Sequence, residues 1–268
     1  MTRCATVALL LVALLVGAPS AASAQDAPNK QISPLDLPID KPVRGRALQD
    51  PNQPEQPPEA PEPEPEPDPV AEEPPTFFGE EIEAPTDAII YVVDRSNSMH
   101  QKVGPFVGLD GNVIGGGNRF DRARVALKRS IADLSDNFTF NIVFYDHCIY
   151  IWKPARVEAN DENKAQAFAF LDSVRPNVYG WTNIGLATYA ALEDKENKTV
   201  VLLTDGSPNY LDCNKQYMGD TEVHRALIRF GNTQGAKIHT FAIGAGAEAS
   251  DFMRDVAADH GGTFTEIN

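Results

Sequence analysis

The sequence has few positive charges and, after its first residues, no long apolar run. Of its 268 residues, 23 are lysine or arginine and 38 are aspartate or glutamate, which gives a formal net charge of −15. Neutralising phosphates supplies most of the affinity of proteins for nucleic acids, so an acidic chain without a basic stripe is not expected to bind nucleic acid. No segment after the N-terminus is long and apolar enough for us to expect a membrane span there.

Proline and aromatic residues are unevenly distributed along the chain. Residues 25–85 hold 16 of the 21 prolines, whereas residues 86–268 hold 20 of the 22 aromatic residues, so only the second part is expected to form a core. Residues 25–85 also carry 15 acids and 4 bases, and alternating Pro and Glu favours extended polyproline II. We expect residues 25–85 to be a disordered acidic linker and residues 86–268 to be one folded domain.

The N-terminus has the pattern of an export signal. Arg3 precedes an apolar run over residues 5–16, and small residues follow up to Ala22-Ser23-Ala24, an A-x-A cleavage pattern. The run is shorter than the ~20 apolar residues that span a bilayer, which favours a cleaved signal peptide over an anchor. We therefore expect residues 1–24 to be a signal peptide and the mature chain to be periplasmic, on the cell surface or extracellular, with membrane attachment only if the signal stays uncleaved.

Two cysteines, Cys148 and Cys213, remain after the signal peptide. Export would place them where disulfides persist, and only one intramolecular pairing is available to them. The sequence leaves open whether they are bridged or are two free thiols, because it does not show whether their Cα atoms come within the ~7 Å that a bridge requires.

Apolar strands alternate with helical segments after Thr86. Residues 88–94 are a continuous apolar run that ends in an acid, which is typical of a buried parallel strand. Further strands are expected near residues 139–145, 148–152, 199–204, 237–243 and 263–267, helices near 120–134, 162–174, 183–192, 222–230 and 249–258, and a long Gly-rich loop over 101–118. The alternation predicts a doubly wound α/β fold with a mostly parallel six-stranded sheet, one antiparallel edge strand and helices on both faces.

Three segments expected at the carboxyl end of this sheet carry oxygen ligands. Asp94, Ser96 and Ser98 follow the first strand, Thr182 precedes a helix, and Asp205 follows the strand at 199–204. Ligands of such sheets bind beyond the carboxyl ends of the strands, so we expect these side chains to meet. Carboxylates and hydroxyls suit a hard divalent cation rather than zinc, and the residue types alone leave Mg²⁺, Mn²⁺ and Ca²⁺ open. With only about two negative charges around it, the ion would attract an acidic group from a partner.

These segments resemble the metal-ion-dependent adhesion site of the von Willebrand factor type A domain, whose pattern is D-x-S-x-S, then a Thr, then an Asp after a hydrophobic strand. The resemblance implies that Ser96, Ser98 and Thr182 bind the metal directly, and that Asp94 and Asp205 act mostly through water, which leaves one position for an acidic ligand. The flanking segments, residues 88–100, 119–134, 199–207 and 237–244, are similar to secreted bacterial members of the family. The long loop over residues 101–118 departs from the family pattern.

Motifs of the common enzyme classes are missing. The sequence has no G-x-S-x-G elbow, phosphate-binding loop or H-E-x-x-H pair, and Ser96 stands where a phosphoryl-accepting Asp94 would need a second acid. Residues 244–249, followed by Glu266, superficially match a dinucleotide fingerprint, but only two residues follow Glu266, so the further strands of a mononucleotide-binding half are missing. We therefore expect neither catalysis nor nucleotide binding.

The pattern as a whole indicates an exported, non-enzymatic binding or adhesion module that recognises a protein or peptide carboxylate through a divalent cation, with Mg²⁺ as the first choice. Trp181 either contacts the partner or packs under its loop, and Phe106 and Val107 in the long loop are further candidate contacts. The alternative function is a metal-independent type A scaffold or an assembly component of an envelope complex, whose binding would survive a chelator.

Overall fold

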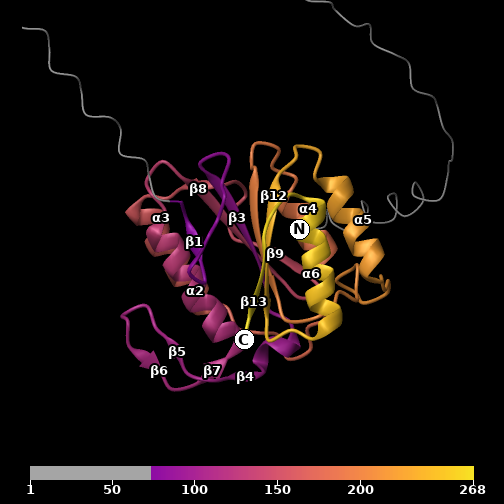
Figure 1. The fold of residues 1–268 in the computed structure, drawn as a ribbon, viewed down its shortest axis with the longest axis horizontal. Coiled ribbons are helices and arrows are strands. Elements are labelled where there is room, and N and C mark those ends of the chain that lie inside the picture. Colours follow the sequence, from indigo (N-terminus) through magenta and orange to yellow (C-terminus); the bar gives the residue numbers. More distant parts are fainter. Residues whose placement is uncertain (1–73) are drawn as a thin grey trace, which may run out of the picture. The chain divides into compact units, whose positions relative to one another are not determined.

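The computed structural model describes residues 74–268; the predicted signal peptide and residues 25–73 of the predicted linker lie outside the described residues. A seven-stranded sheet forms the centre, and five of its strands run parallel in the order β8-β3-β11-β12-β13 (Figure 1). These are β3 (Ala88–Asp94), β8 (Thr139–Tyr145), β11 (Thr199–Thr204), β12 (Lys237–Ile243) and β13 (Phe264–Ile267). The chain runs outward from β3 to β8 and then returns to the other side of β3 to form β11. The strand order therefore reverses at β3, the place where ligand sites of doubly wound folds lie.

The central strands are apolar on both faces because both faces are covered. All seven residues of β3 are buried, and their side chains alternate between two cores. Ile89, Tyr91 and Val93 belong to one core cluster. Ile90 and Val92 belong to the other. This two-sided burial explains why the strand reads as a continuous apolar run rather than as an alternating one.

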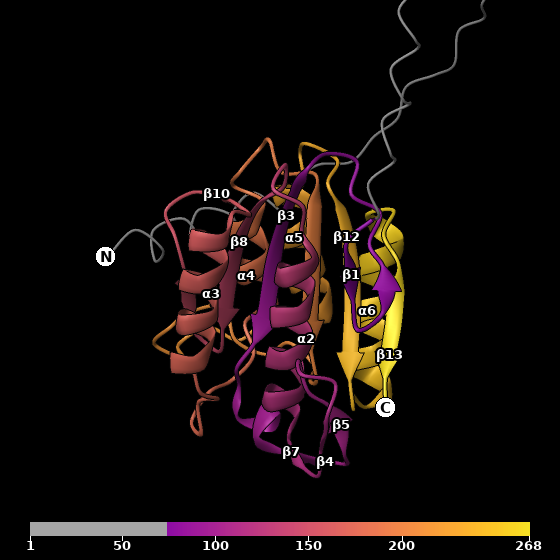
Figure 2. The ribbon, with the colours of Figure 1, turned by 90° about the vertical axis from the view of Figure 1, so that its left-hand side faces the viewer.

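Helices form a layer on each face of the sheet (Figures 1 and 2). One layer consists of α2 (Arg119–Asp133) and α3 (Asp161–Ser173), and the other consists of α4 (Ile184–Ala191), α5 (Thr221–Gly231) and α6 (Ala247–Asp259). This arrangement confirms the predicted doubly wound α/β fold. None of the helices in the described part of the chain is both long and apolar enough to cross a bilayer.

The antiparallel edge of the sheet differs from the prediction of a single strand. Two short strands, β9 (Ile149–Ile151) and β10 (Val157–Glu158), pair with opposite ends of β8, which brings the sheet to seven strands rather than six. Between them, the side chain of Asn141 donates to Lys153 O at 2.9 Å and accepts from Lys153 N at 3.3 Å. The Asn141 side chain thus takes the place of backbone hydrogen bonds between β8 and the edge segment. Pro154, which has no N–H to donate, follows at this point.

The folded domain begins before Thr86, which corrects the predicted end of the disordered linker. Strands β1 (Thr76–Phe77) and β2 (Glu80–Glu81) form a hairpin whose turn has positive φ at Phe78 (54°) and Gly79 (85°). Phe77 and Ile82 are buried in the core cluster on the α2 face. The surrounding prolines and glutamates hid this hairpin in the sequence, because its only core signal is two or three apolar residues.

The long loop over residues 101–118 is more ordered than the sequence indicated. It contains two short antiparallel ladders, β4 (Lys102–Val103) with β7 (Gly117–Asn118) and β5 (Phe106–Val107) with β6 (Val113–Ile114). The prediction that Phe106 contacts a partner is wrong: the side chain is 9 % exposed and packs tightly over Gly117. Only Val107 faces outward, at 50 % exposure. Strand alternation explains the difference, because neighbouring side chains point to opposite sides.

Replacing Phe77 tests whether the hairpin belongs to the folded domain. Its ring is 1 % exposed and lies 4.8 Å from the ring of Phe241 and 6.0 Å from that of Tyr91, centroid to centroid. Because removing a buried Phe side chain costs about 3–5 kcal/mol, we expect Phe77→Ala to lower the free energy of unfolding in urea by about 3 kcal/mol or more. The exposed Phe230 is the control, and Phe230→Ala should cost under about 1 kcal/mol. Equally small effects of the two changes would contradict the burial of Phe77.

His224 in α5 is expected to make stability depend on pH. Its Nδ1 accepts a hydrogen bond from Gly185 N at 2.9 Å, and its Nε2 is buried without a partner in the described part of the chain. Burial lowers the pKa of His224 from 6.5 to about 4. In the unfolded chain the ring takes up a proton near pH 6.5, whereas in the folded chain it does so only near pH 4, so the stability contributed by the neutral ring is lost as pH falls through this window.

His224→Asn is the variant for this measurement, because the amide oxygen can accept from Gly185 N in place of Nδ1. We expect the free energy of unfolding to fall less steeply between pH 6.5 and 4 in the variant than in the wild type, by up to about 1.4 kcal/mol per pH unit. Parallel curves for the two proteins would show that His224 keeps an ordinary pKa.

Candidate metal centre

The first group of predicted ligands lies where β3 ends. Asp94 is the last residue of β3, and Ser98 lies in the short 3-10 helix η1 (Asn97–His100) that follows. Ser96 N donates to Asp94 Oδ1 at 2.6 Å, which folds the chain back over the carboxylate. Met99 of η1 is fully buried in the core cluster that also contains Phe120 and Leu127 of α2. The spacing of two between the polar residues thus places their side chains together at one end of the strand.

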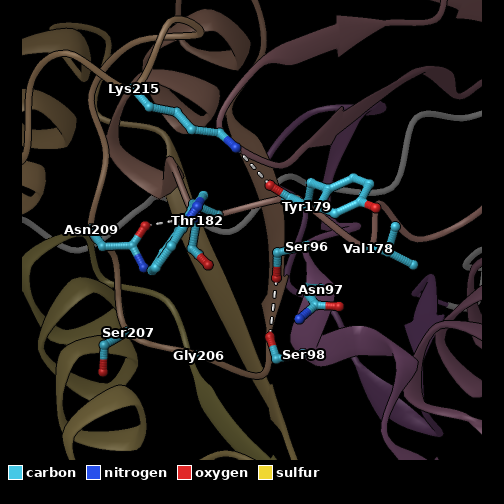
Figure 3. A pocket seen from close by; sticks show the side chains of 12 residues that line it. Ser96, Asn97, Ser98, Val178, Tyr179, Thr182, Gly206, Ser207, Asn209 and Lys215 are labelled. Carbon is cyan, nitrogen blue, oxygen red and sulfur yellow. Dashed lines mark hydrogen bonds between the residues drawn. The ribbon is translucent and has the colours of Figure 1, made fainter.

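The second and third groups come from Asp205, after β11, and from Thr182, before α4. Ser98 Oγ lies 3.1 Å from Ser96 Oγ and donates to Asp205 Oδ1 at 2.5 Å. A Cβ built on Gly206 would lie 3.7 Å from Ser98 Oγ and 3.9 Å from Thr182 Oγ1, so these two hydroxyls face one place. Figure 3 shows Ser96, Ser98 and Thr182 around the same pocket. The structure therefore brings together the five residues that the sequence singled out.

Burial and repulsion between like charges govern the electrostatics of the two carboxyl groups. Burial, reinforced by the nearby Asp205, raises the pKa of Asp94 to about 7. Thr204 opposes this shift by donating its hydroxyl to Asp94 Oδ2 at 2.6 Å. Burial also raises the pKa of Asp205, against the hydrogen bonds from Ser98 and Arg119. A cation beside the two groups would favour their ionised forms.

Arg119 is part of the site, although the sequence analysis did not single it out. It begins α2, its guanidinium lies 2.8 Å from Asp205 Oδ2, and its other arm donates to Gly244 O at 2.5 Å. It neutralises one of the two carboxylates while leaving Asp205 Oδ1 directed at Ser98. No sequence signal marks this role, because 86 residues separate Arg119 from Asp205.

Asp146 is a second residue that the sequence analysis missed. It is fully buried after β8 and accepts from Cys148 N at 2.7 Å and from Asn177 Nδ2 at 2.8 Å, with Arg95 Nε at 3.4 Å. One carboxylate thus joins the loop after β3, the turn after β8 and the loop that leads to Thr182. An acid at the carboxyl end of an apolar strand, as at Asp94, was the signal that could have found it.

The donor set fits a hard divalent cation. Two carboxylates and three hydroxyls are oxygen ligands of the kind that Mg²⁺, Mn²⁺ and Ca²⁺ take. Within residues 74–268, no hydrogen bond reaches Thr182 Oγ1, so this atom keeps its lone pairs for another partner. Asp146, His147 and Cys148 also lie close enough together to hold an ion. That group fits poorly, because the sulfur of Cys148 is in a disulfide.

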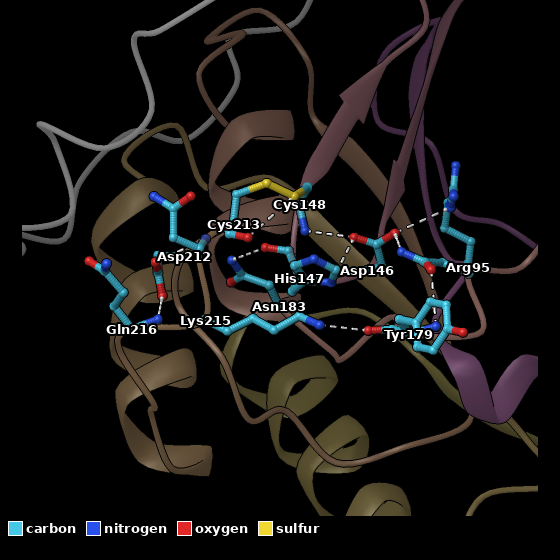
Figure 4. Close-up of a disulfide and its surroundings, with 12 residues drawn as sticks. Arg95, Asp146, His147, Cys148, Tyr179, Asn183, Asp212, Cys213, Lys215 and Gln216 are labelled. Carbon is cyan, nitrogen blue, oxygen red and sulfur yellow. Dashed lines mark hydrogen bonds and ion pairs between the residues drawn. A yellow bond between two sulfur atoms is a disulfide. The ribbon is translucent and has the colours of Figure 1, made fainter.

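Cys148 and Cys213 are joined in the structure, with their Cα atoms 4.4 Å apart (Figure 4). This is the bridged form of the two alternatives that the sequence left open. The disulfide links the turn after β8 to the loop after β11, and that loop lines the pocket with Ser207, Asn209 and Lys215.

Trp181 lies on the wall of this pocket. Its side chain is 46 % exposed, and its ring centroid lies 5.3 Å from that of Tyr210. The residue therefore packs against a neighbouring loop on one side and leaves the other side open. This placement keeps Trp181 as a candidate partner contact, in contrast to Phe106.

Comparison with known proteins identifies the family of the folded part. The sequence model of the von Willebrand factor type A domain matches residues 88–268. The chain belongs to the von Willebrand factor type A family. Its fold and the order of its polar segments agree with this assignment.

The proteins to which this chain is similar are much longer than the matched segment. Inter alpha-trypsin inhibitor, heavy chain 4, of Mus musculus is 26 % identical over 204 residues, which is 71 % of this chain and 19 % of the relative. Von Willebrand factor A domain-containing protein 3B of Homo sapiens is 29 % identical over 184 residues, 68 % of this chain and 12 % of the relative. A solved von Willebrand factor type A structure from Catenulispora acidiphila superposes with a TM-score of 0.51 and 18 % identity, covering 68 % of this chain and 39 % of that one. The chain thus spans under a fifth of the length of the two sequence relatives, and the solved structure supports the fold alone.

The raised pKa of Asp94 predicts how Asp94→Asn changes the stability of this type A domain in chelator. The folded state keeps the proton of Asp94 up to about pH 7, whereas the unfolded chain releases it near pH 3.8, so Asp94 reduces stability increasingly as pH rises through this window. We expect the free energy of unfolding of Asp94→Asn relative to wild type to increase between pH 5 and pH 8, by about 1 kcal/mol or more. A relative stability that stays constant across this range would mean that Asp94 titrates normally.

Proposed function

We propose that this type A domain is a non-enzymatic binding module that recognises an acidic group of a protein or peptide through a divalent cation, with Mg²⁺ as the first choice. The observation that carries the proposal is the convergence of Ser96, Ser98 and Thr182 on one place beside two buried carboxylates. In this proposal the three hydroxyls bind the ion directly, and Asp94 and Asp205 act mostly through water.

The charge balance of the site explains why the ligand would be acidic. With both carboxyl groups ionised, Arg119 offsets one of the two negative charges. A divalent cation would then leave the centre with a net positive charge of about one, inside a partly buried environment where charges are poorly screened. A carboxylate from a partner would neutralise this excess, whereas a neutral or basic group would not.

The space above the hydroxyls is large enough for part of a partner. A pocket of about 550 Å³ opens over Ser96, Ser98 and Thr182, and Tyr179 and Trp181 form part of its wall (Figure 3). Its volume lies within the range of about 300–1,000 Å³ of ordinary ligand sites. Exposed aromatic side chains beside a charged centre are typical contacts in protein recognition.

The arrangement of hydroxyls argues against catalysis. A nucleophilic serine needs an adjacent general base, commonly a histidine, within hydrogen-bond reach. Ser96 Oγ and Ser98 Oγ instead contact each other, and Ser98 donates to a carboxylate that is already paired with Arg119. Among residues 74–268, no histidine makes a hydrogen bond with either serine.

The same fold would also serve as a metal-independent scaffold or assembly component of an envelope complex. This alternative requires binding that persists in chelator. Export through the predicted signal peptide and display on the predicted acidic linker belong to both proposals.

The first measurement is the thermal unfolding midpoint of the full chain in chelator and then in excess Mg²⁺, Mn²⁺ or Ca²⁺. A bound ion stabilises the folded state by about 2.7 kcal/mol at a hundredfold excess over its dissociation constant. We expect the midpoint to rise in wild type, to rise much less in Ser98→Ala, and to rise as in wild type in Ser207→Ala. Ser207 is a matched control because it lines the same pocket but is not among the proposed ligands. An equal shift in all three proteins would place the ion elsewhere, and no shift with any cation would favour the metal-independent scaffold.

A further inference from the structure

The loop over residues 206–219, which the disulfide at Cys213 cross-links, lines the pocket at the proposed metal centre. It follows β11 and is anchored at its base by Asn209, which accepts from Thr182 N and donates its own backbone N–H to Thr182 O, both at 2.9 Å. Its two arms pair where Leu211 N donates to Tyr217 O at 2.9 Å. The disulfide from Cys213 ties the loop to the turn after β8 (Figure 4). The loop is therefore tied to Thr182 at its base and to the turn after β8 at its side.

The tip of this loop presents Lys215. The carboxylate of Asp212 accepts from three backbone N–H groups of the tip, those of Asn214 at 3.1 Å and of Gln216 and Tyr217 at 2.8 Å. Lys215 itself has a φ of 60°, a left-handed conformation that residues other than glycine rarely adopt. Such conformations persist where the surrounding structure enforces them, often at binding sites. The tip is thus built to hold Lys215 in one place.

Lys215 is the only charged residue that lines the pocket in the described part of the chain. The chain as a whole has a net charge of −15, whereas the residues that line this pocket carry a net charge of +1. The ammonium group donates to Tyr179 O at 2.9 Å, on the wall opposite the loop (Figure 3). An ammonium group has three donors, so two remain for a ligand in the pocket.

Resting on the proposed function, we propose that Lys215 forms a second acidic subsite, so that the partner is a peptide segment with two acidic side chains. One acid would bind the cation at Ser96, Ser98 and Thr182, and the other would pair with Lys215. The chain of the peptide between them would lie against Tyr179 and Trp181. The disulfide-anchored loop would thereby select acidic pairs over single acids.

The ligand for the test comes from a random dodecapeptide library displayed on phage. The full chain is immobilised in Mg²⁺, and bound phage are eluted with chelator, so that only metal-dependent peptides are recovered. One recovered sequence is synthesised, and its acids are replaced one at a time by the corresponding amides. Dissociation constants are then measured for wild type, Lys215→Gln, Lys215→Arg and Lys102→Gln. Lys102 is an exposed lysine outside the pocket and controls for the loss of one positive charge.

We expect recovered peptides to need two acids. Amidation of one acid should abolish metal-dependent binding. Amidation of the other should weaken binding to wild type about tenfold, the size of one charge-assisted contact in a partly exposed site, and should leave binding to Lys215→Gln unchanged. Lys215→Gln should itself weaken the two-acid peptide about tenfold, Lys215→Arg should restore most of the affinity, and Lys102→Gln should stay within about twofold of wild type. The shift of the unfolding midpoint by Mg²⁺ should be the same in Lys215→Gln as in wild type.

Three results would overturn the proposal. Peptides with one essential acid would show that no second subsite exists. Equal losses on amidation of the second acid in wild type and in Lys215→Gln would place that acid elsewhere. Recovery of no chelator-eluted peptide would overturn the proposed function together with this subsite, whereas the first two results would leave the metal-dependent function standing.

Discussion

Two buried carboxyl groups at the ends of adjacent parallel strands are the constraint on which the site depends. Asp94 ends β3 and Asp205 follows β11, the two strands between which the chain order reverses. Burying two like charges side by side is costly unless each is paired and hydrogen-bonded. The hydroxyl of Thr204, the backbone of Ser96 and the guanidinium of Arg119 meet this requirement only in part. Burial therefore keeps the pKa values of both acids raised, and a divalent cation beside them would favour their ionised forms.

The loops around this pair hold one another by backbone hydrogen bonds rather than by apolar packing alone. Asn97 N donates to Gly180 O at 3.1 Å, and Asn177 N donates to Arg95 O at 2.7 Å, so the loop after β3 and the loop before α4 are joined twice. The carboxylate of Asp146 lies beneath both. These bonds fix the loops that carry the hydroxyls proposed to bind an ion. Such preorganisation reduces the conformational entropy that binding would otherwise cost.

The sequence predicted the elements whose signal is local. Strand β3 was found because it is a continuous apolar run that ends in an acid. Helix α2 is also marked locally, because Asn118 caps it and its buried residues lie on one side. The residues of the proposed metal site were singled out because each follows a recognisable strand or precedes a helix. The hairpin around Phe77 and the split edge around Asn141 were missed, because both depend on contacts with residues far along the chain. Arg119 and Lys215 were missed for the same reason, since nothing near them in sequence shows which pocket or carboxylate they meet.

The disulfide also acts on the unfolded chain. It joins residues 65 positions apart, and the segment that it closes contains β9, β10, α3, α4 and β11. In the chain-entropy view, closing a loop of this length removes unfolded conformations worth about 4 kcal/mol. The disulfide makes this contribution to stability without using a side chain of the pocket, because neither cysteine is among the proposed ligands. The loop over residues 206–219 is mostly polar and at least partly exposed, so it has little apolar surface of its own to bury. The disulfide thereby holds in place a loop that apolar packing alone would hold weakly.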